Sequence, residues 1–293
     1  MRRRPAAATG CSSGRRCCAR STGRIAPIGT KVGFVGAGRV GAGLSLAFSR
    51  CGYAIAGVAS RKRGDAQQVV DASDVVFLTV PDEALGAVCA QLKWRKDQAA
   101  VHCSGAAELS VLKTVAQVGG FHPLQMFADP EVAARGLAGC AIAVEADEPL
   151  LSVLKQMVAS LRGRLLVVPP GARAAYHAGA HYAAAFMCAL LAEGIEIWKR
   201  IGIAPEDSLP ALVALLRGAT DAVAHSGPAR AMAGSIARGD ADTVRRHIAA
   251  LDALDPKHGE LYRTLALRTV PLALAAGGIT RERAEELRRL LDT

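Results

Sequence analysis

The sequence has few aromatic residues and no long uninterrupted apolar run. Phe, Trp and Tyr make up 4% of the 293 residues, which leaves few rings on which nucleic-acid bases could stack. The most apolar long stretch, 172–198, is interrupted by basic and acidic side chains. It therefore falls short of the roughly 20 predominantly apolar residues of a membrane span. We expect neither a nucleic-acid partner nor a membrane.

Acidic residues are absent from the first thirty positions, which hold seven arginines. These arginines account for most of the formal net charge of +10 and leave about +3 for the rest of the chain. The segment also lacks the apolar core of a secretory signal. We interpret residues 1–30 as a disordered Arg-rich tail or a wrongly assigned start, with an organellar transit peptide as the alternative.

Cysteine is present, but not in the spacing of a zinc site or of a disulfide framework. Three of the eight cysteines fall in the tail, and the other five are scattered among apolar neighbours. This usage is typical of buried thiols in a reducing compartment. We therefore expect a cytoplasmic protein without a metal site.

Short apolar runs alternate with helical patterns in the first part of the chain. Strands are predicted at 31–35, 54–59, 74–80, 99–103, 120–123, 140–144 and 165–170. Helical patterns lie between several of these runs, notably at 82–92 and 149–162. This alternation predicts an α/β fold, with a doubly wound, mostly parallel Rossmann-like sheet over residues 31–170.

The strand signal ends near residue 170, and the remainder of the chain has only helical patterns. Helices are predicted at 172–201, 205–224, 241–254, 257–275 and 280–291, separated by Gly and Pro residues. We therefore expect residues 171–293 to form an all-α domain.

Three glycines, Gly36, Gly38 and Gly41, follow the first predicted strand in the sequence G-A-G-R-V-G and begin a helix. In a dinucleotide-binding loop, the first glycine permits a tight turn and the second lets the backbone approach the pyrophosphate. The third lets the helix pack on the strand, with the helix N-terminus facing the phosphates. The position of the motif favours dinucleotide binding over a purely structural turn.

The second predicted strand ends in Ala59 and is followed by Ser60-Arg61-Lys62-Arg63, where an NAD enzyme would carry an acidic residue. Arg61 can bind a phosphate through two N–H groups and Ser60 can donate a hydrogen bond, so this turn predicts NADP. A solvated basic turn is the alternative. The expected cofactor-binding residues are Gly36, Gly38, Arg39, Val40, Gly41, Ser60, Arg61, Val80, Pro81, His102, Ser104 and Gly105.

Only residues 65–73 separate the basic turn from the next strand. This length is too short for a normal crossover helix together with the additional unit that such folds usually carry. Either part of the cofactor domain is missing, or a minimal turn joins the two strands.

The chain resembles a family that joins a Rossmann-like NADP-binding domain to the helical "domain of unknown function 2520", often labelled NADP oxidoreductases. The matching blocks are VGFVGAGRVG at 32–41, HCSG at 102–105 with GFHPLQ at 120–125, AAYHAGA at 174–180, ARGDADTVRRH at 237–247 and YRTLA at 262–266. The resemblance implies the architecture of the 6-phosphogluconate dehydrogenase and ketopantoate reductase superfamily. It further implies a cleft between the domains and a homodimer through the helices.

Three departures from that family affect the expected activity. The connection at 65–73 lacks roughly a helix and a strand. Ala185 stands where a polar residue, often Asn, is expected, and Ala233 and Ser235 stand where Thr and Pro are common.

His177 and His181 are four residues apart and share one face of a predicted helix. In the related ketopantoate and hydroxyacid enzymes, the corresponding helix carries a Lys that protonates the carbonyl oxygen. Histidine can perform this step near neutral pH. His102 and Ser104 follow a strand at its carboxyl end, where Ser104 and the Gly105 amide could hold a substrate carboxylate. His122, after the next strand, is a third candidate histidine.

In the helical domain, Arg238, Asp240 and His247 are expected to bind an acidic substrate. Asp240 could instead cap the helix that follows it. Zinc binding by His177 and His181 is an alternative, although no H-E-x-x-H pattern or third ligand accompanies them. A Cys103 nucleophile with His102 is weaker, because neighbours along a strand point to opposite faces.

The sequence therefore predicts a cytoplasmic NADP-dependent oxidoreductase that reduces a small acidic substrate, with a ketopantoate-like keto acid first and His177 as the proton donor. Two alternatives stay open. One is a catalytically silent NADP-binding or regulatory protein, and the other is an imine reductase related to pyrroline carboxylate reductases.

Overall fold

A computed structural model describes residues 29–292, so the tail predicted at 1–30 lies almost wholly outside the described residues. The chain divides into two compact units, Met1–Ala178 and Gly179–Thr293. The change in composition near residue 170 thus precedes the division between units by a few residues.

The first unit contains a seven-stranded sheet in the order β2-β1-β3-β4-β5-β6-β7. All neighbouring strands are parallel except β5 and β6, which are antiparallel. The mostly parallel Rossmann-like sheet predicted from the sequence is confirmed. Its strands are β1 Lys31–Val35, β2 Ala54–Ala59, β3 Val75–Leu78, β4 Ala99–His102, β5 Gln117–Pro123, β6 Ala141–Ala146 and β7 Arg164–Val167.

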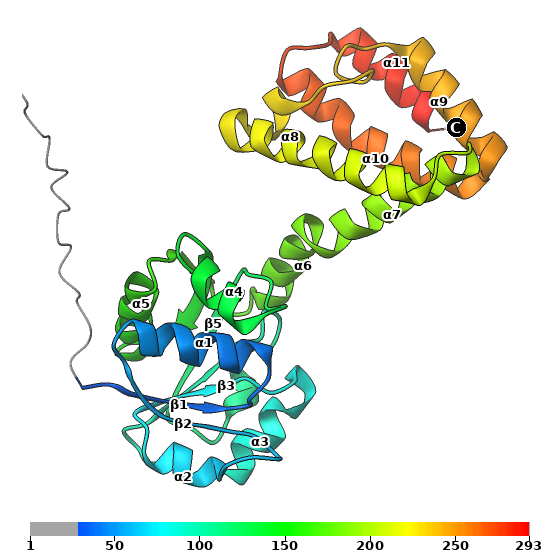
Figure 1. Cartoon of the computed structure of the whole chain (residues 1–293). Helices are drawn as coiled ribbons and strands as arrows, with labels where there is room; N and C mark the ends of the chain where they lie inside the picture. The colour runs from blue at the N-terminus through cyan, green and yellow to red at the C-terminus, as the bar shows by residue number, and fades with distance from the viewer. Residues whose placement is uncertain (1–28, 293) are drawn as a thin grey trace, which may run out of the picture. The chain divides into compact units, whose positions relative to one another are not determined.

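Helices cover both faces of this sheet (Figure 1). One apolar core joins the sheet to α1, α4 and α5 through residues such as Phe48 and Leu154. The other core joins it to α2, α3 and a 3-10 turn through Val70, Leu85 and Leu112. The helices are α1 Arg39–Arg50, α2 Ala66–Asp71, α3 Leu85–Gln91, α4 Pro130–Gly136 and α5 Leu150–Ser160, with 3-10 turns η1 Asp82–Ala84 and η2 Leu109–Leu112.

The connection between β2 and β3 contains a short helix, so the alternative of a minimal turn between the two strands is wrong. The six-residue helix α2 crosses over β1, because β2 and β3 pair with opposite edges of that strand. Glycines in the strands make this close crossing possible. A Cβ atom at Gly33 or Gly57 would lie 2.8 Å from the side chain of Val69 on α2. Within the described chain β2 is the edge strand, in agreement with the predicted loss of a helix and a strand.

The helices of the remaining chain are α6 Arg173–Ala183, α7 Ala185–Arg200, α8 Pro205–Ala231, α9 Ala241–Leu254, α10 Pro256–Ala275 and α11 Arg281–Leu291. In the second unit, an apolar core of α9, α10 and α11 contains Val244, Val270 and Leu287. The single helix predicted at 172–201 is interrupted at Ala184, whose φ of −123° and ψ of −80° are not helical. The interruption separates α6 from α7, and no proline or glycine at that position signalled it.

By length and composition alone, the segment Arg173–Arg200 is apolar enough to cross a membrane, with a mean hydropathy of 1.3 over its best window. None of this window is buried in this structure. Core and interface helices of soluble proteins also pass this test, so the expectation of no membrane stays a prediction.

Candidate cofactor and catalytic site

The three glycines after β1 occupy three different environments. Gly36 has φ +121°, and a Cβ there would lie 2.5 Å from the backbone of Thr79. Gly38 faces open space, whereas a Cβ at Gly41 would overlap the carbonyl oxygen of Gly36. These environments match the tight turn, the open approach and the close helix packing expected of a dinucleotide-binding loop.

The N-terminus of α1 has the chemistry of an anion site. Its N-cap residue is Gly38, no side chain accepts a capping hydrogen bond, and the first turn contains no acidic residue. The first amide groups of the helix are therefore left for a ligand, and the helix dipole favours negative charge there. Arg39 begins this helix and adds a positive charge at the same end.

The basic turn after β2 is a tight hairpin closed by reciprocal backbone hydrogen bonds between Ser60 and Arg63, of 2.7 and 3.2 Å. The side chains of Arg61, Lys62 and Arg63 are exposed at its tip. Asp65, the first carboxylate after the strand, caps α2 by accepting from the amides of Gln67 and Gln68. The acidic group is thus held in a structural contact while the cations face solvent.

The glycine loop and the basic turn line one pocket of about 340 Å³. The end of β3 and the helices α2 and α3 complete its wall. The volume lies in the usual range for small-molecule and cofactor sites. Its lining residues are Val35, Gly36, Ala37, Gly38, Ser60, Arg61, Ala66, Thr79, Val80, Pro81, Val88, Gln91 and Leu92.

The residues present therefore fit an NADP-type ligand, with an open backbone at Gly38 and cations at Ser60–Arg63. Six of the predicted cofactor residues line the pocket, namely Gly36, Gly38, Ser60, Arg61, Val80 and Pro81. Gly41 lies against the loop rather than in the pocket. His102, Ser104 and Gly105 do not line it and form part of a neighbouring polar cluster.

Ser104 is held in place by three hydrogen bonds. Its hydroxyl donates to Oδ2 of Asp82 at 2.5 Å and accepts from the amides of Ala106 and Ala107 at 3.2 and 2.9 Å. The only hydroxyl hydrogen is therefore used within the chain. The expected role of Ser104 in holding a substrate carboxylate stays a prediction, and this contact with Asp82 opposes it.

A fully buried arginine supports the same loop. Arg173, the first residue of α6, donates to the carbonyl oxygen of Ser104 and to Oε2 of Glu145, the latter at 3.2 Å. Gly120 on β5 makes room for the guanidinium, since a Cβ there would overlap it. Burial raises the pKa of Glu145, and the Arg173 charge opposes this shift. Through these two contacts, Arg173 connects α6 to β6 and to the loop after β4.

His102 is completely buried at the end of β4. Burial, followed by the charge of Arg173, lowers its pKa to about 4, so the ring is neutral near pH 7. Among residues 29–292, neither of its ring nitrogens has a hydrogen-bond partner. A neutral, enclosed imidazole of this kind is poorly suited to proton transfer.

His122, at the end of β5, lies beside two residues of α6. Its Nδ1 is 2.9 Å from the hydroxyl oxygen of Tyr176, and its ring lies edge-on to His177 with centroids 5.4 Å apart. His177 in turn packs on Gly105, where any Cβ would overlap its ring. The first unit therefore brings together His102, Ser104, Gly105, His122 and His177, from parts of the sequence far apart.

The candidates of the second unit have different surroundings. The ring of His181 contacts Phe186, and Arg238 is exposed. Asp240 caps α9 by accepting from the Thr243 amide at 3.0 Å, and that hydrogen bond lowers its pKa. His247 Nδ1 lies 3.0 Å from the hydroxyl oxygen of Tyr262. Their roles toward a substrate stay predictions.

Neither of the alternative chemistries, zinc binding and a Cys103 nucleophile, finds support in the described residues. No three His, Cys, Asp or Glu side chains within residues 29–292 converge as they would around a metal ion. Burial raises the pKa of the Cys103 thiol, which disfavours the thiolate that a nucleophile needs.

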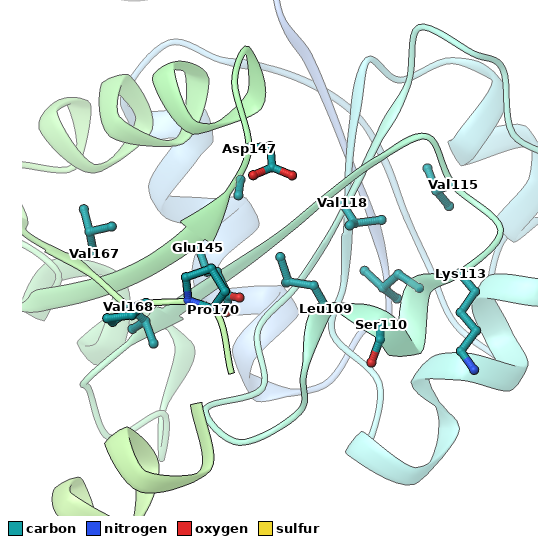
Figure 2. A pocket seen from close by; sticks show the side chains of 13 residues that line it. Leu109, Ser110, Lys113, Val115, Val118, Glu145, Asp147, Val167, Val168 and Pro170 are labelled. Carbon is teal, nitrogen blue, oxygen red and sulfur yellow. The ribbon is translucent and has the colours of Figure 1, made fainter. Parts of the chain in front are cut away.

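A larger pocket of about 470 Å³ lies elsewhere in the first unit (Figure 2). It is mostly apolar and lies between η2 and the ends of β6 and β7, with Glu145 and Lys113 among its polar residues. It contains none of the predicted site residues. We therefore take the smaller pocket beside the glycine loop as the candidate site.

Sequence reasoning missed four residues that shape the site. They are Thr79, Asp82, Arg173 and Tyr176. Thr79 donates a hydrogen bond to the Gly36 carbonyl oxygen at 2.6 Å. The sequence contained one indication for Tyr176, which stands in the AAYHAGA block beside His177. A tyrosine hydroxyl that is withdrawn from solvent usually needs a polar partner, and a neighbouring histidine can supply one.

Comparison with solved structures shows a shared fold at low identity. Protein TM1727 from Thermotoga maritima is 22% identical with a TM-score of 0.69, over 83% of this chain and 98% of that one. A 1-pyrroline-5-carboxylate reductase from Streptococcus pyogenes is 12% identical with a TM-score of 0.57, over 89% and 98%. A reductive aminase from Aspergillus terreus, in complex with NADPH and ethyl levulinate, is 13% identical with a TM-score of 0.56, over 90% and 92%.

A search of curated protein sequences finds no match. Two family models match the chain in succession. A Rossmann-like domain matches residues 18–128, and the domain of unknown function 2520 matches residues 140–269. The chain therefore joins a Rossmann-like domain to the domain of unknown function 2520.

Proposed function

We propose that this protein is an NADP-dependent oxidoreductase that reduces a C=O or C=N group of a small molecule. The observation that carries the proposal is the pocket shared by the glycine loop and the Ser60–Arg63 turn. The 2′-phosphate of NADP needs fixed donors and cations, and Ser60 and Arg61 supply them beside an open glycine backbone. The solved structures of a reductive aminase with NADPH and of pyrroline carboxylate reductase share this fold.

The bound cofactor would supply a hydride to the carbon of the reducible group. The residues of the chain then have to hold that group and supply a proton. We assign the proton transfer to His177, which is held against Gly105 and beside His122. The π electrons of the double bond move to its oxygen or nitrogen, and the proton from His177 completes the alcohol or amine.

A ketopantoate-like keto acid is the first substrate class. For such a substrate, Arg238 of the second unit is the proposed partner of the carboxylate. An imine is the second class, because solved structures of a pyrroline carboxylate reductase and of a reductive aminase share the fold of this chain.

The proposal also includes a cytoplasmic location and a homodimer through the helical unit. Phe186 and Leu190 support the dimer, because they lie four residues apart on α7 with 46% and 44% exposure. Replacing both with glutamate should turn a dimer into a monomer in analytical ultracentrifugation. A monomeric wild-type protein would contradict the dimer.

The direct test is NADPH oxidation by the purified protein with 2-oxo acids and with 2-methyl-1-pyrroline. We expect turnover with one of these probes and a loss of at least about 10²-fold in His177→Ala. A wild-type rate that His177→Ala leaves intact would remove His177 from the mechanism. Tight NADPH binding without turnover of any probe would favour the silent, regulatory protein.

A further inference from the structure

We propose that Tyr176 is a positioning residue that holds His122 in the neutral form with its hydrogen on Nε2. His122 then uses this N–H group to hold the oxygen or nitrogen atom of the double bond being reduced. This inference rests on the proposed reductase function and assigns two residues of its site.

The contact itself is specific. The Tyr176 hydroxyl oxygen lies 2.9 Å from His122 Nδ1, and the two rings are edge-on with centroids 5.8 Å apart and an interplanar angle of 86°. The residues are 54 positions apart in the sequence, on α6 and at the end of β5. Their contact is therefore a product of the tertiary fold rather than of local helix geometry.

The direction of this hydrogen bond follows from the chemistry of the two groups. A phenol has one hydrogen and donates readily, whereas neutral imidazole offers one lone pair. Within residues 29–292, His122 is the only hydrogen-bond partner recorded for the Tyr176 hydroxyl. If His122 Nδ1 carried the hydrogen, the phenol hydrogen would have no acceptor in that part of the chain. We therefore assign Tyr176 as the donor to Nδ1, which leaves the ring hydrogen on Nε2.

The surroundings keep both partners neutral. Burial, followed by the charges of His177 and Arg173, lowers the pKa of His122 to about 4. Burial raises the pKa of Tyr176 to about 12. At pH 7 the phenol keeps its hydrogen and the imidazole keeps its lone pair, which is the state that the hydrogen bond requires.

His122 stands where the sheet presents its ligand-binding edge. β5 runs parallel to β4, so its carboxyl end lies on the same edge as His102 and Ser104. The His122 ring also contacts His177, the proposed proton donor. A neutral imidazole N–H at this position can stabilise negative charge that develops during hydride transfer. The proton of the product still comes from His177.

The first experiment reads the ring directly. Long-range ¹⁵N–¹H spectra of histidine-labelled protein distinguish hydrogen on Nε2 from hydrogen on Nδ1. The spectra would be recorded at pH 7 without and with NADPH, and His122 would be assigned from the missing signals of His122→Gln. We expect hydrogen on Nε2 in the wild type and a change of tautomer in Tyr176→Phe. Tyr182→Phe is the matched control, since Tyr182 lies on the same helix with 74% exposure.

The second experiment tests the role of the N–H group with the same NADPH assay. A Gln amide can place a donor near the position of Nε2, whereas an Asn amide reaches only the position of Nδ1. We expect His122→Asn to lower kcat by roughly 10²-fold, His122→Gln by about 10-fold, and Tyr176→Phe by about 10-fold. The NADPH Kd should stay unchanged in all three variants.

Hydrogen on Nδ1 in the wild type, or an unchanged tautomer in Tyr176→Phe, would overturn the inference. Equal loss of kcat in the Asn and Gln variants would overturn the donor role of Nε2. Absence of NADPH binding would overturn the proposed function and the substrate contact, while the spectra still decide the tautomer. If Tyr176→Phe does not fold, incorporation of a fluorinated tyrosine, whose hydroxyl is more acidic, should shift the His122 ¹⁵N signals.

Discussion

Two tyrosine–histidine pairs, one in each unit, have nearly the same geometry in different surroundings. His122 and Tyr176 are 2.9 Å apart with rings at 86°, and His247 and Tyr262 are 3.0 Å apart with rings at 89°. His122 lies among buried groups that lower its pKa to about 4, whereas His247 is exposed on α9. A short contact alone therefore does not define a catalytic group, because the burial and charge around it determine its protonation.

The same contrast holds for the arginines of the two units. Arg173 is completely buried with Glu145, whereas Arg263 forms two hydrogen bonds with Asp252 at a partly exposed site. The first unit thus encloses the Arg173–Glu145 pair behind the candidate site, and the second keeps the Arg263–Asp252 pair nearer to solvent. Matched substitutions in the two units can test how much this burial contributes to the free energy of unfolding.

The largest expected effect is at Arg173. Arg173→Ala leaves the Glu145 carboxyl buried without its partner and should lower the free energy of unfolding of the first unit by about 3–5 kcal/mol. Arg263→Ala should cost the second unit no more than about 1 kcal/mol. Urea denaturation can follow each unit separately, because Trp94 lies in the first and Trp198 in the second. Replacing one tryptophan with Phe isolates the fluorescence of the other. Equal losses of unfolding free energy in the two units would contradict the contrast.

A smaller effect is expected at the glycines. Gly41→Ala places a methyl group against the Gly36 carbonyl oxygen and should destabilise the first unit by about 1–3 kcal/mol. It should also weaken NADPH binding, since the loop has to move. Gly218→Ala on α8 meets no atom within 4 Å and should stabilise the second unit by up to about 1 kcal/mol. Calorimetric unfolding and NADPH titration of both variants provide the measurement, and an unchanged Gly41→Ala protein would refute the packing role of that glycine.

The last expected effect depends on pH. The pKa of His102 is about 4 in the folded protein and near 6.5 in the unfolded chain, so the unfolded state binds more protons between these values. Its contribution to stability is complete above pH 6.5 and decreases as the pH falls toward 4, by at most about 1.4 kcal/mol per pH unit. His102→Leu should reduce this slope in the first unit, because it removes the titrating ring. His247→Leu is the control in the second unit, and a slope unaffected by His102→Leu would show that another group controls it.

The parts of the molecule that sequence predicts best are those determined by neighbouring residues. The glycine loop, the basic turn and the strand ends depend on local backbone and charge, and the structure places Gly36, Gly38, Ser60 and Arg61 in one pocket. Helix α2 was missed because its fit depends on glycines in two other strands. The interruption at Ala184 has no Pro or Gly signal of its own.

The contacts of the polar cluster around His102, His122 and His177 could not be predicted for a related reason. Arg173 with Glu145 and Tyr176 with His122 join positions 28 and 54 residues apart. A linear pattern indicated that His122 and His177 lie near a strand end and on a helix, but it carried no information on which side chains face them. The surrounding charges then determine protonation, and these come from three separate elements.

The measurement that tests the central claim most directly is the calorimetric Kd of NADPH and NADH for the wild type, Arg61→Ala and Arg63→Ala. Arg61 lines the pocket with the glycine loop, while Arg63 lies in the same exposed turn but outside the lining. We predict that the wild type binds NADPH at least about 10-fold more tightly than NADH, and that Arg61→Ala removes most of this preference while Arg63→Ala keeps it. Equal affinity for the two cofactors, or a preference that survives Arg61→Ala, would contradict the assignment.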